Sequence, residues 1–530
     1  MSTATSVLMP AALGIAGFDA FRPAQVAALE RIAASEARVV MMQAPTGSGK
    51  SLIARAAGAV LGMHATYCST TKQLQAQFCR DFQDAVELRG RANYRTERGP
   101  FPAVTCDDCD WREGRGCSWC VSRQSCPYRV QKEKAIEAPF AVLNTAYFLA
   151  EANSAGGFSD EERLLVLDEA DALEAQLLEA VCVKLTDLHL QRLRLPSPRL
   201  TDRPEDEDWT SWADQAATAV RLEARQLERE ADALRGAGDE RYTRAQRRAR
   251  SWKALATNLG RLARDLAEDA RSWVRVENGD GLSFKPVFVR RYAHRLLWAH
   301  AARFVLMSAT IIDPGQFARD LGLQPDEWEW LELPSSFPKQ NRLVFYRPAG
   351  SMAFRYRDET LPRMIAALDA ILDDYPERVL VHTHTYGIAR QVITSSRHRA
   401  RMLTYAAAEE RERALGAFTA ADGEGRVLIA PSMQRGVDLP DDLCRCVVVM
   451  VVPKPYQGDA RVRLRLRTPD GQRWSQVHQI RELCQMTGRG VRHAGDQCDT
   501  YILDAEFARL WRSPAARGLF PGWWREAVVT

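Results

Sequence analysis

The 530-residue sequence lacks any run of about 18 apolar residues, the length that a helix needs to cross a bilayer. Its start, Met1–Pro10, also lacks the basic segment and apolar core of a secretory signal. These two absences predict a cytoplasmic protein without membrane contact. In that compartment cysteines stay reduced, so clustered cysteines point to metal rather than to disulfides.

A large net charge is also missing, because 72 basic residues nearly balance 68 acidic residues and leave a net charge of +4. A nearly neutral chain cannot attract nucleic acid over its whole surface, so any such surface must be local. The length predicts two or more hydrophobic cores, because one core seldom grows beyond about 250–300 residues.

The strongest motif is A-P-T-G-S-G-K-S at residues 44–51. An apolar run at 38–42 predicts a buried strand before it and residues 51–57 predict a helix after it, so the turn can bind phosphate at a helix N-terminus. Lys50 would reach the β- and γ-phosphates, and the Ser51 hydroxyl could ligate Mg²⁺. The predicted nucleotide contacts in this loop are Ala44, Pro45, Thr46, Gly47, Ser48, Gly49, Lys50 and Ser51.

A second motif, Asp168-Glu169-Ala170-Asp171, follows the apolar run at 164–167. The run predicts a buried strand, and ligands of open α/β sheets bind beyond the carboxyl ends of their strands. Asp168 would therefore hold Mg²⁺, directly or through water, and Glu169 would polarise the water that attacks ATP.

The C-terminal part of the chain predicts a second parallel sheet, with candidate strands at 378–381, 426–430, 447–451 and 500–503. Two turns there carry polar groups suited to a nucleotide. One places Gly436 beside Asp438 at a strand exit. The other spaces Arg489 and Arg492 three residues apart, on one helical face and close after Gln485.

Arginine stays cationic and donates two parallel hydrogen bonds, which suits the charge that develops during phosphoryl transfer. We therefore predict catalytic roles for Gln485, Arg489 and Arg492, with the two arginines facing Lys50 across an interdomain cleft as arginine fingers. A solvated basic helix is the alternative interpretation of this arginine pair.

In this order the motifs resemble those of superfamily 2 DNA helicases, and their details resemble the XPD/DinG-like, iron–sulfur branch. The segments that carry the resemblance are 88–94, 143–147, 308–310, 335–338 and 381–386. The sequence departs from the branch at Asp171, where histidine is usual, at Arg435, where an acidic residue is usual, and after Asn93-Tyr94, where no cysteine follows directly.

The resemblance implies two RecA-like motor domains that hydrolyse ATP with Mg²⁺ and move along DNA from 5′ to 3′. It also implies that Gln25 reads the adenine edge, for which an amide that both donates and accepts is well suited. The Ser308-Ala309-Thr310 element would couple the nucleotide to the nucleic-acid site.

Five of the twelve cysteines fall within residues 106–126, spaced C-x₂-C-x₇-C-x₂-C-x₅-C. Two C-x₂-C pairs could hold a tetrahedral Zn²⁺, and four cysteines could equally hold an iron–sulfur cluster. A metal-free remnant is the third alternative. The resemblance implies a [4Fe–4S] cluster on Cys109, Cys117, Cys120 and Cys126, with Cys106 as a substitute ligand. Aromatic and arginine side chains alternate with these cysteines, as on a surface for single-stranded DNA or as packing around the cluster.

Residues 180–285 are rich in arginine, glutamate, alanine and leucine. Apolar stripes at 220–234 and 252–266 predict an antiparallel helical hairpin, at the position of the family's arch domain. The fold that we predict is α/β, with two RecA-like parallel-sheet motor domains and with a cysteine-rich metal-binding insertion and a helical arch inserted in the first. The expected boundaries are 1–95, 138–178 and 286–322 for the first motor domain, 96–137 for the cysteine-rich insertion, 179–285 for the arch and 323–530 for the second motor domain.

The predicted function is an ATP-dependent helicase that moves along single-stranded DNA and unwinds duplex DNA, including forked DNA. A different class also fits the motifs, namely an ATP-gated nucleic-acid clamp or remodelling subunit of a larger complex. A zinc-ribbon RNA helicase is a third interpretation, suggested by the D-E-A-D tetrad alone.

Overall fold

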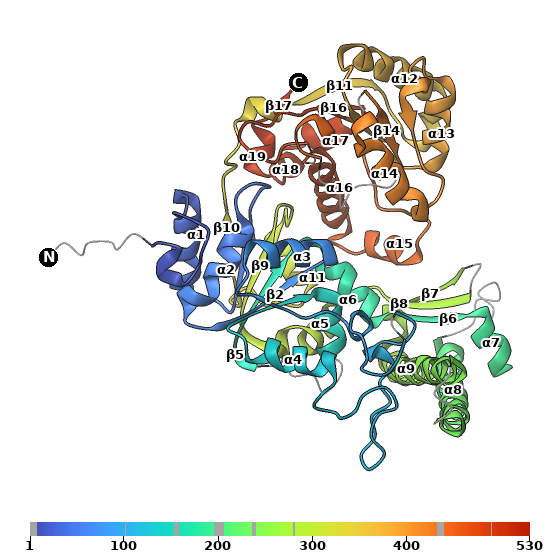
Figure 1. Ribbon diagram of the computed structural model, residues 1–530. Coiled ribbons are helices and arrows are strands. Elements are labelled where there is room, and N and C mark those ends of the chain that lie inside the picture. Colours follow the sequence, from blue (N-terminus) through green and yellow to red (C-terminus); the bar gives the residue numbers. More distant parts are fainter. Residues whose placement is uncertain are drawn as a thin grey trace.

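The computed structural model describes residues 8–100, 102–152, 158, 160–195, 206–235, 240–278, 281–423, 425–431, 439–488 and 490–530. Two α/β lobes lie one above the other, and both insertions extend from the lower, first lobe (Figure 1). Within the described residues, no helix combines the length and the apolar character that crossing a membrane requires.

Among the described residues, seven parallel strands form the first sheet, in the order β10-β1-β9-β5-β2-β4-β3. These strands are β1 (Val39–Gln43), β2 (His64–Ser69), β3 (Val86–Glu87), β4 (Phe140–Asn144), β5 (Asp160–Asp168), β9 (Ala301–Ser308) and β10 (Trp328–Glu332). The helices of this lobe are α1 (Pro23–Ala34), α2 (Lys50–Leu61), α3 (Lys72–Asp81), α4 (Pro127–Glu137), α5 (Thr145–Ala152), α6 (Leu173–Val181), α10 (Arg290–Leu296) and α11 (Pro314–Asp320).

The first sheet is buried on both faces. Alternate residues of β1 enter different cores, Val39 and Met41 on one side and Val40 and Met42 on the other. This double burial explains why the strand is apolar along its length, as strands of parallel sheets usually are.

The boundary expected between the lobes at residue 322 lies too early. β10 pairs with β1 in parallel along its whole length, from Val39 opposite Trp328 to Gln43 opposite Glu332. The first lobe therefore extends at least to Glu332. This strand leaves little signal in the sequence, because Trp328–Glu332 mixes glutamates with apolar side chains at a partly exposed edge instead of forming an apolar run.

Seven parallel strands of the described residues form the second sheet, in the order β13-β14-β12-β15-β16-β11-β17. They are β11 (Val344–Gly350), β12 (Val379–His382), β13 (Met402–Leu403), β14 (Val427–Ala430), β15 (Cys446–Val449), β16 (Asp499–Asp504) and β17 (Val528–Val529). The helices are α12 (Arg357–Asp374), α13 (Tyr386–Ser395), α14 (Arg411–Thr419), α15 (Ala460–Leu466), α16 (Gly471–Thr487), α17 (Phe507–Trp511), α18 (Pro514–Arg517) and α19 (Gly522–Arg525). The prediction of two RecA-like parallel-sheet lobes is confirmed.

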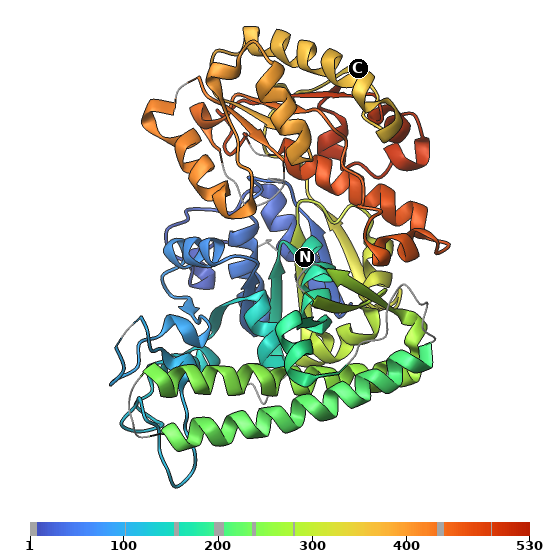
Figure 2. The same cartoon turned by 90° about the vertical axis from the view of Figure 1, so that its right-hand side faces the viewer.

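The arch is built on two long helices, α8 (Asp206–Leu234) and α9 (Glu240–Asp269), as the apolar stripes predict. Figure 2 shows them side by side beneath the first lobe, running from the cysteine-rich insertion to a small antiparallel sheet. That sheet, which the sequence analysis did not predict, has the order β6-β8-β7. Its strands are β6 (Val183–Thr186), β7 (Trp273–Asn278) and β8 (Gly281–Pro286), and helix α7 (Asp187–Leu193) follows β6.

Candidate active site and metal centre

The phosphate loop connects β1 to α2 at the carboxyl edge of the first sheet. Gly47 and Gly49 both have φ near 78°, a left-handed conformation that favours glycine. Gly49 caps α2, so the first N–H groups of that helix face the turn. Lys50 folds back over the loop and donates a hydrogen bond from Nζ to the Ala44 carbonyl oxygen at 3.1 Å.

Gln25 lies against this loop from α1. Its Nε2 donates to the Ser48 carbonyl oxygen at 3.2 Å, and its Oε1 accepts from the backbone N–H of Arg22 at 2.8 Å. Arg22 in turn donates from Nη1 to the Gly47 carbonyl oxygen at 2.6 Å. The hydrogen bond to Ser48 connects α1 to the phosphate loop, and Gln25 is buried there, with 2 % of its surface exposed. Its role in reading adenine stays a prediction.

The segment after the first sheet also covers the phosphate loop, a contact that the sequence analysis did not predict. A Cβ added to Gly47 would lie 1.8 Å from Cζ of Phe337, so the phenyl ring packs directly on this glycine. The neighbouring Ser336 donates from Oγ to the Gly47 carbonyl oxygen at 3.2 Å. The only sequence signal was the place of these two residues in the segment 335–338 that carries the family resemblance.

β5 ends at Asp168, which is 8 % exposed. Its Oδ2 accepts a hydrogen bond from the Tyr67 hydroxyl at 2.6 Å, and its Oδ1 accepts from the backbone N–H of Glu169 at 2.9 Å. Burial and the neighbouring Asp168 raise the pKa of Tyr67 well above its ordinary value, so the phenol keeps its proton and donates it. Tyr67 is a second residue that sequence reasoning missed, because nothing in β2 distinguishes it from a core tyrosine.

Asp171 joins the D-E-A-D segment to the Ser308-Ala309-Thr310 element. One carboxylate oxygen accepts from Ser308 Oγ at 2.8 Å and the other from Thr310 Oγ1 at 3.2 Å. The second lobe contacts the same threonine, because Gln485 Nε2 donates to Thr310 Oγ1 at 2.7 Å and Arg481 Nε to the Thr310 carbonyl oxygen at 3.2 Å. This element therefore lies between the acidic motif and α16 of the second lobe.

Arg492 enters the cleft from the second lobe and is largely buried. Burial lowers the pKa of its guanidinium to about 10, although the carboxylates of Glu169 and Asp496 favour the charged form. Glu169 of the first lobe is thus one of the charges that act on Arg492. Arg489, Gly436 and Asp438 lie outside the described residues, so their predicted roles stay predictions.

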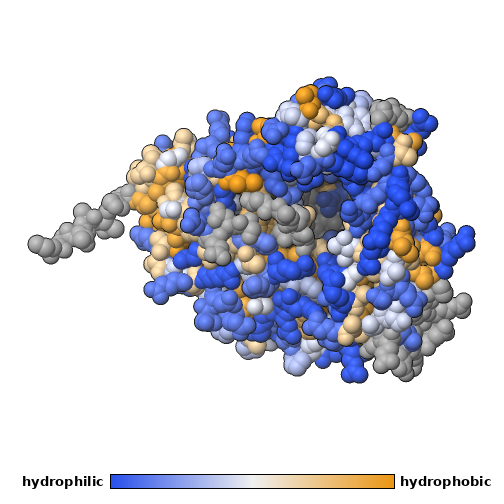
Figure 3. Space-filling model, turned by 90° about the horizontal axis from the view of Figure 1, so that it is seen from below, coloured by the Kyte–Doolittle hydropathy of each residue, from blue (hydrophilic) through white to orange (hydrophobic). Residues whose placement is uncertain are grey.

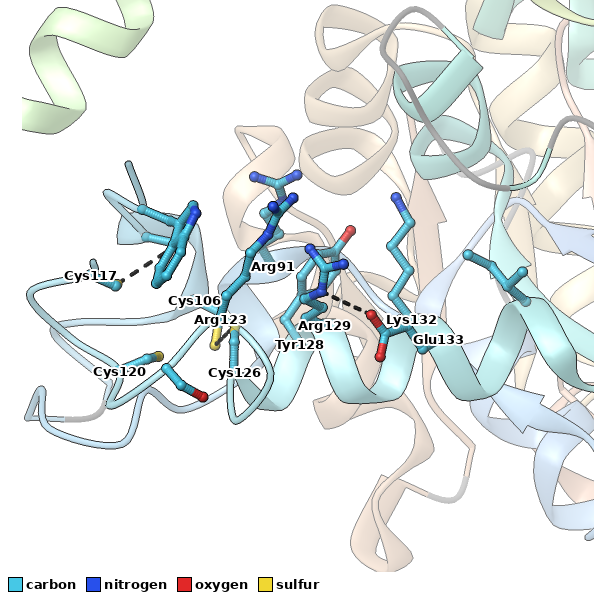
Figure 4. A pocket seen from close by; sticks show the side chains of 14 residues that line it. Arg91, Cys106, Cys117, Cys120, Arg123, Cys126, Tyr128, Arg129, Lys132 and Glu133 are labelled. Carbon is cyan, nitrogen blue, oxygen red and sulfur yellow. Dashed lines mark hydrogen bonds and ion pairs between the residues drawn. The ribbon is translucent and has the colours of Figure 1, made fainter. Parts of the chain in front are cut away.

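All five clustered cysteines line one cavity of about 490 Å³ between the insertion and α4. Figure 4 shows Cys117 and Cys120 on the loop, with Cys106 beside Cys126 at the start of α4. The Sγ atoms of Cys106 and Cys126 lie 3.9 Å apart, and those of Cys109 and Cys117 lie 4.0 Å apart. Cys106 is thus as much part of the cavity as the four expected ligands.

In each close pair one thiol loses its proton more easily than the other. The hydrogen bond with Cys106 lowers the pKa of Cys126 and the hydrogen bond with Cys117 lowers the pKa of Cys109, whereas the pKa values of Cys106 and Cys117 are raised. Thiolates are the form that binds metal.

The spacing of the sulfurs tests which group fits. Four thiolates around Zn²⁺, at about 2.3 Å each, would stand about 3.8 Å from one another. The two pairs above come about that close, but among the described residues no three cysteines bring their sulfurs within 4.8 Å of one another. The sulfurs therefore do not form a closed four-cysteine zinc site, and the cavity of about 490 Å³ has room for a group larger than a single ion. Trp119 and Tyr128 are buried, so they pack in the insertion rather than forming its surface.

Comparison with known proteins matches both lobes to helicase families. Residues 22–197 match the DEAD/DEAH box helicase family, and residues 368–527 match the helicase C-terminal domain family. A solved structure titled XPD helicase superimposes with a TM-score of 0.61 at 15% identity, covering 95% of this chain and 98% of that one. By these matches the chain carries the two domains of a DEAD/DEAH box helicase, and its fold is like that of the XPD helicase structure.

Two more solved structures show the same fold. One titled XPD apo has a TM-score of 0.58 at 16% identity and covers 92% of this chain and 97% of its own. Xpd4 of S. tokodaii also has a TM-score of 0.58, at 15% identity, and covers 93% and 99%. No curated protein matches the sequence. The resemblance stated from the motifs is confirmed.

This fold brings the predicted nucleotide residues of the first lobe to one edge of its sheet. The phosphate loop follows β1, and Asp168 and Glu169 end β5, with β9 between these two strands. Gln485 reaches this edge from the second lobe through its hydrogen bond to Thr310.

Proposed function

We propose that this helicase hydrolyses ATP to move from 5′ to 3′ along single-stranded DNA and to unwind duplex DNA. The observation that carries the proposal is the contact between the lobes at Thr310, whose Oγ1 donates to Asp171 of the acidic motif and accepts from Gln485 Nε2 of the second lobe at 2.7 Å. A nucleotide on the phosphate loop would be enclosed by both lobes. Its hydrolysis would therefore change how the lobes fit together. The polarity rests on the family resemblance.

Within this site each side chain has a distinct task. Lys50 would bind the β- and γ-phosphates, Glu169 would orient and polarise the attacking water, and Arg492 would stabilise the charge of the transferred phosphoryl group. Tyr67 holds one oxygen of Asp168 through its hydrogen bond. Mg²⁺, which Ser51 and Asp168 would hold, supplies positive charge to the phosphate oxygens.

We also propose that the cysteine cavity holds a [4Fe–4S] cluster on Cys109, Cys117, Cys120 and Cys126, with Cys106 as the alternative first ligand. The five cysteines that line one cavity of about 490 Å³ support this assignment. A cluster of this kind would supply rigid cross-linking of a loop that has little regular structure. Iron and sulfide content after anaerobic purification tests the assignment, and zinc alone would overturn it.

A DNA contact is supported on the second lobe by an exposed cluster at the carboxyl end of β11. Phe354 is 88% exposed and Tyr356 is 42% exposed. The guanidinium of Arg355 stands 4.5 Å from the ring centre of Tyr356, and that of Arg357 stands 5.6 Å from the ring centre of Phe354. Exposed rings paired with cations suit the bases and phosphates of a single strand.

The lower face of the molecule supports a second part of the path. Seen from below, the surface is mostly hydrophilic and is hollowed near its centre (Figure 3). A single strand would bind in a hollow of this kind.

A strand-displacement assay tests the function. We expect ATP-dependent displacement from 5′-tailed and forked duplexes, none from 3′-tailed duplexes, and stronger ATPase stimulation by single-stranded DNA than by RNA. ATPase stimulated by DNA without any displaced strand would instead favour the clamp. Stronger stimulation by RNA would favour an RNA helicase.

A further inference from the structure

Asp496 is a carboxylate with 0% exposure, four residues after Arg492. Its Oδ2 accepts a hydrogen bond from the backbone N–H of Arg492 at 3.0 Å. Its Oδ1 accepts from the backbone N–H groups of Asp441 at 3.2 Å and Gln497 at 2.9 Å. Arg445 supplies the countercharge, with Nη1 at 3.2 Å from the same Oδ1. The buried charge is thus compensated by four donors.

A cation site is the other interpretation of this cluster, because ligand atoms of Asp441, His493 and Asp496 lie within 4.8 Å of one another. The oxygens of Asp496 already accept from Arg445 and three backbone N–H groups. His493 Nε2 lies 2.8 Å from Asp441 Oδ1, so these two side chains also bond to each other. The cluster is therefore satisfied by hydrogen bonds and carries no metal proposal.

Asp496 connects two segments that the sequence analysis assigned to the nucleotide. Arg492 belongs to the arginine motif after α16, and Asp441 follows the predicted contact Asp438 by three residues. Asp441 has φ of 55°, a conformation that a residue with a side chain rarely adopts, so the segment is held in place by its surroundings. One carboxylate thus holds the backbone of both segments.

The backbone just before Arg492 is also closely packed. A Cβ added to Gly490 would lie 2.3 Å from Cys498 Sγ and 2.9 Å from the Cys444 carbonyl oxygen. The chain at Gly490 therefore packs against the residues just before β15 and β16, and no side chain would fit between them. Arg492 is presented from a backbone that is held on both sides.

We propose that Asp496 is a positioning residue for ATP hydrolysis, which fixes the backbone of Arg492 and keeps it in register with the segment at Asp441. The inference rests on the proposed role of Arg492 as an arginine finger. Without the carboxylate the guanidinium would still bind nucleotide loosely, but it would not stand where charge develops in the transition state.

The variant Asp496→Asn tests this role, because an amide has one acceptor oxygen and cannot accept from all the donors that the carboxylate serves. We expect kcat to fall roughly ten- to hundredfold, as for the loss of a charge-assisted hydrogen bond, while KM for ATP changes less than about twofold. The matched control is Asp442→Asn. It removes a carboxylate that also binds Arg445, at 2.7 Å, but that is exposed and does not contact Arg492.

The double variant with Arg492→Ala separates the two proposals. Arg492→Ala alone should lower kcat on the order of 10³-fold, and adding Asp496→Asn should lower it no further, since the residue acts through Arg492. Full additivity in the double variant, or equal effects of Asp496→Asn and Asp442→Asn, would overturn the positioning role only. A wild-type kcat for Arg492→Ala would instead overturn the finger assignment and with it this inference.

Thermal unfolding checks that Asp496→Asn is folded. If it is not, Arg445→Gln takes its place, since it removes the countercharge and leaves the backbone hydrogen bonds. We then expect a smaller fall in kcat that again disappears in the Arg492→Ala background. A wild-type kcat for Arg445→Gln would overturn the positioning role.

Discussion

Single residues decide whether the phosphate loop works. Lys50 is the only loop residue expected to bring a positive charge to the phosphates, and its Nζ already bridges the loop through the Ala44 carbonyl oxygen. Lys50→Ala should abolish ATP turnover and leave the melting temperature nearly unchanged, because the side chain has no part in a core. ATPase assays and thermal unfolding check this. Lys253→Ala on α9, an exposed lysine, is the control, and normal hydrolysis in Lys50→Ala would remove the loop assignment.

Phe354 gives a second prediction at this scale. Because its ring is almost fully exposed, removing it should change folding little but remove a surface on which a base could stack. Stacking of one base contributes about 1–3 kcal/mol, so Phe354→Ala should weaken single-stranded DNA binding by roughly 5- to 150-fold. Fluorescence anisotropy measures this. Leu222→Ala on α8, 61% exposed, is the apolar control, and equal binding by wild type and Phe354→Ala would contradict the assignment.

At the scale of elements, the arch is held to the cysteine-rich insertion next to the metal cavity. Arg247 of α9 binds both oxygens of Asp108, at 2.7 and 2.8 Å, and Arg235 reaches the carbonyl oxygen of Asp110 at 3.3 Å. Tyr242 and Trp119 stack with ring centres 6.1 Å apart. Since Asp108 and Asp110 flank Cys109, the order of the insertion and the docking of the arch depend on one another.

Cys120→Ser should therefore do more than remove metal. We expect loss of iron, faster hydrogen exchange in the helix ends at 228–235 and 240–247, and loss of strand displacement. DNA-independent ATPase should remain, because the insertion lies away from the phosphate loop. Cys182→Ser, outside the cavity, is the control. Unchanged iron content in Cys120→Ser would contradict its place among the ligands.

At the scale of the whole molecule, α15 docks the second lobe on the first. Arg461 is 8% exposed and donates to the carbonyl oxygens of Pro286 and Val287, both at 3.1 Å, and to Glu174 of α6. Burial raises the pKa of the Glu174 carboxyl, but the positive charge of Arg461 lowers it further, so that the pKa lies below its ordinary value. The pair thus stabilises the docked lobes above pH 4.5, and this contribution is lost as the pH falls through the lower pKa of the folded state.

Arg461→Ala should loosen the lobes, since an unpaired buried charge costs about 3–5 kcal/mol. Small-angle scattering at pH 7 should show a larger radius of gyration than in wild type. Lys285→Ala breaks the Lys285–Asp459 pair, which is more exposed, and should change little. An unchanged radius for Arg461→Ala would show that other contacts hold the lobes.

By itself the sequence determined the local features: the phosphate loop, the acidic turn after β5, the apolar strands and the two arch helices. Each depends on residues close together in the chain, whose spacing sets which side chains share a strand end or a helical face. The sequence did not predict the partly exposed strand β10 or the small sheet beside the arch, because short strands without a long apolar run have little hydrophobic pattern.

Only the tertiary structure decided which distant residues meet. Tyr67 reaches Asp168 because β2 pairs with β5, Phe337 covers Gly47 because the connection between the lobes crosses the loop, and Asp496 joins Asp441. The physical reason is that such contacts depend on strand register and on the packing of the lobes, which no short stretch of sequence encodes.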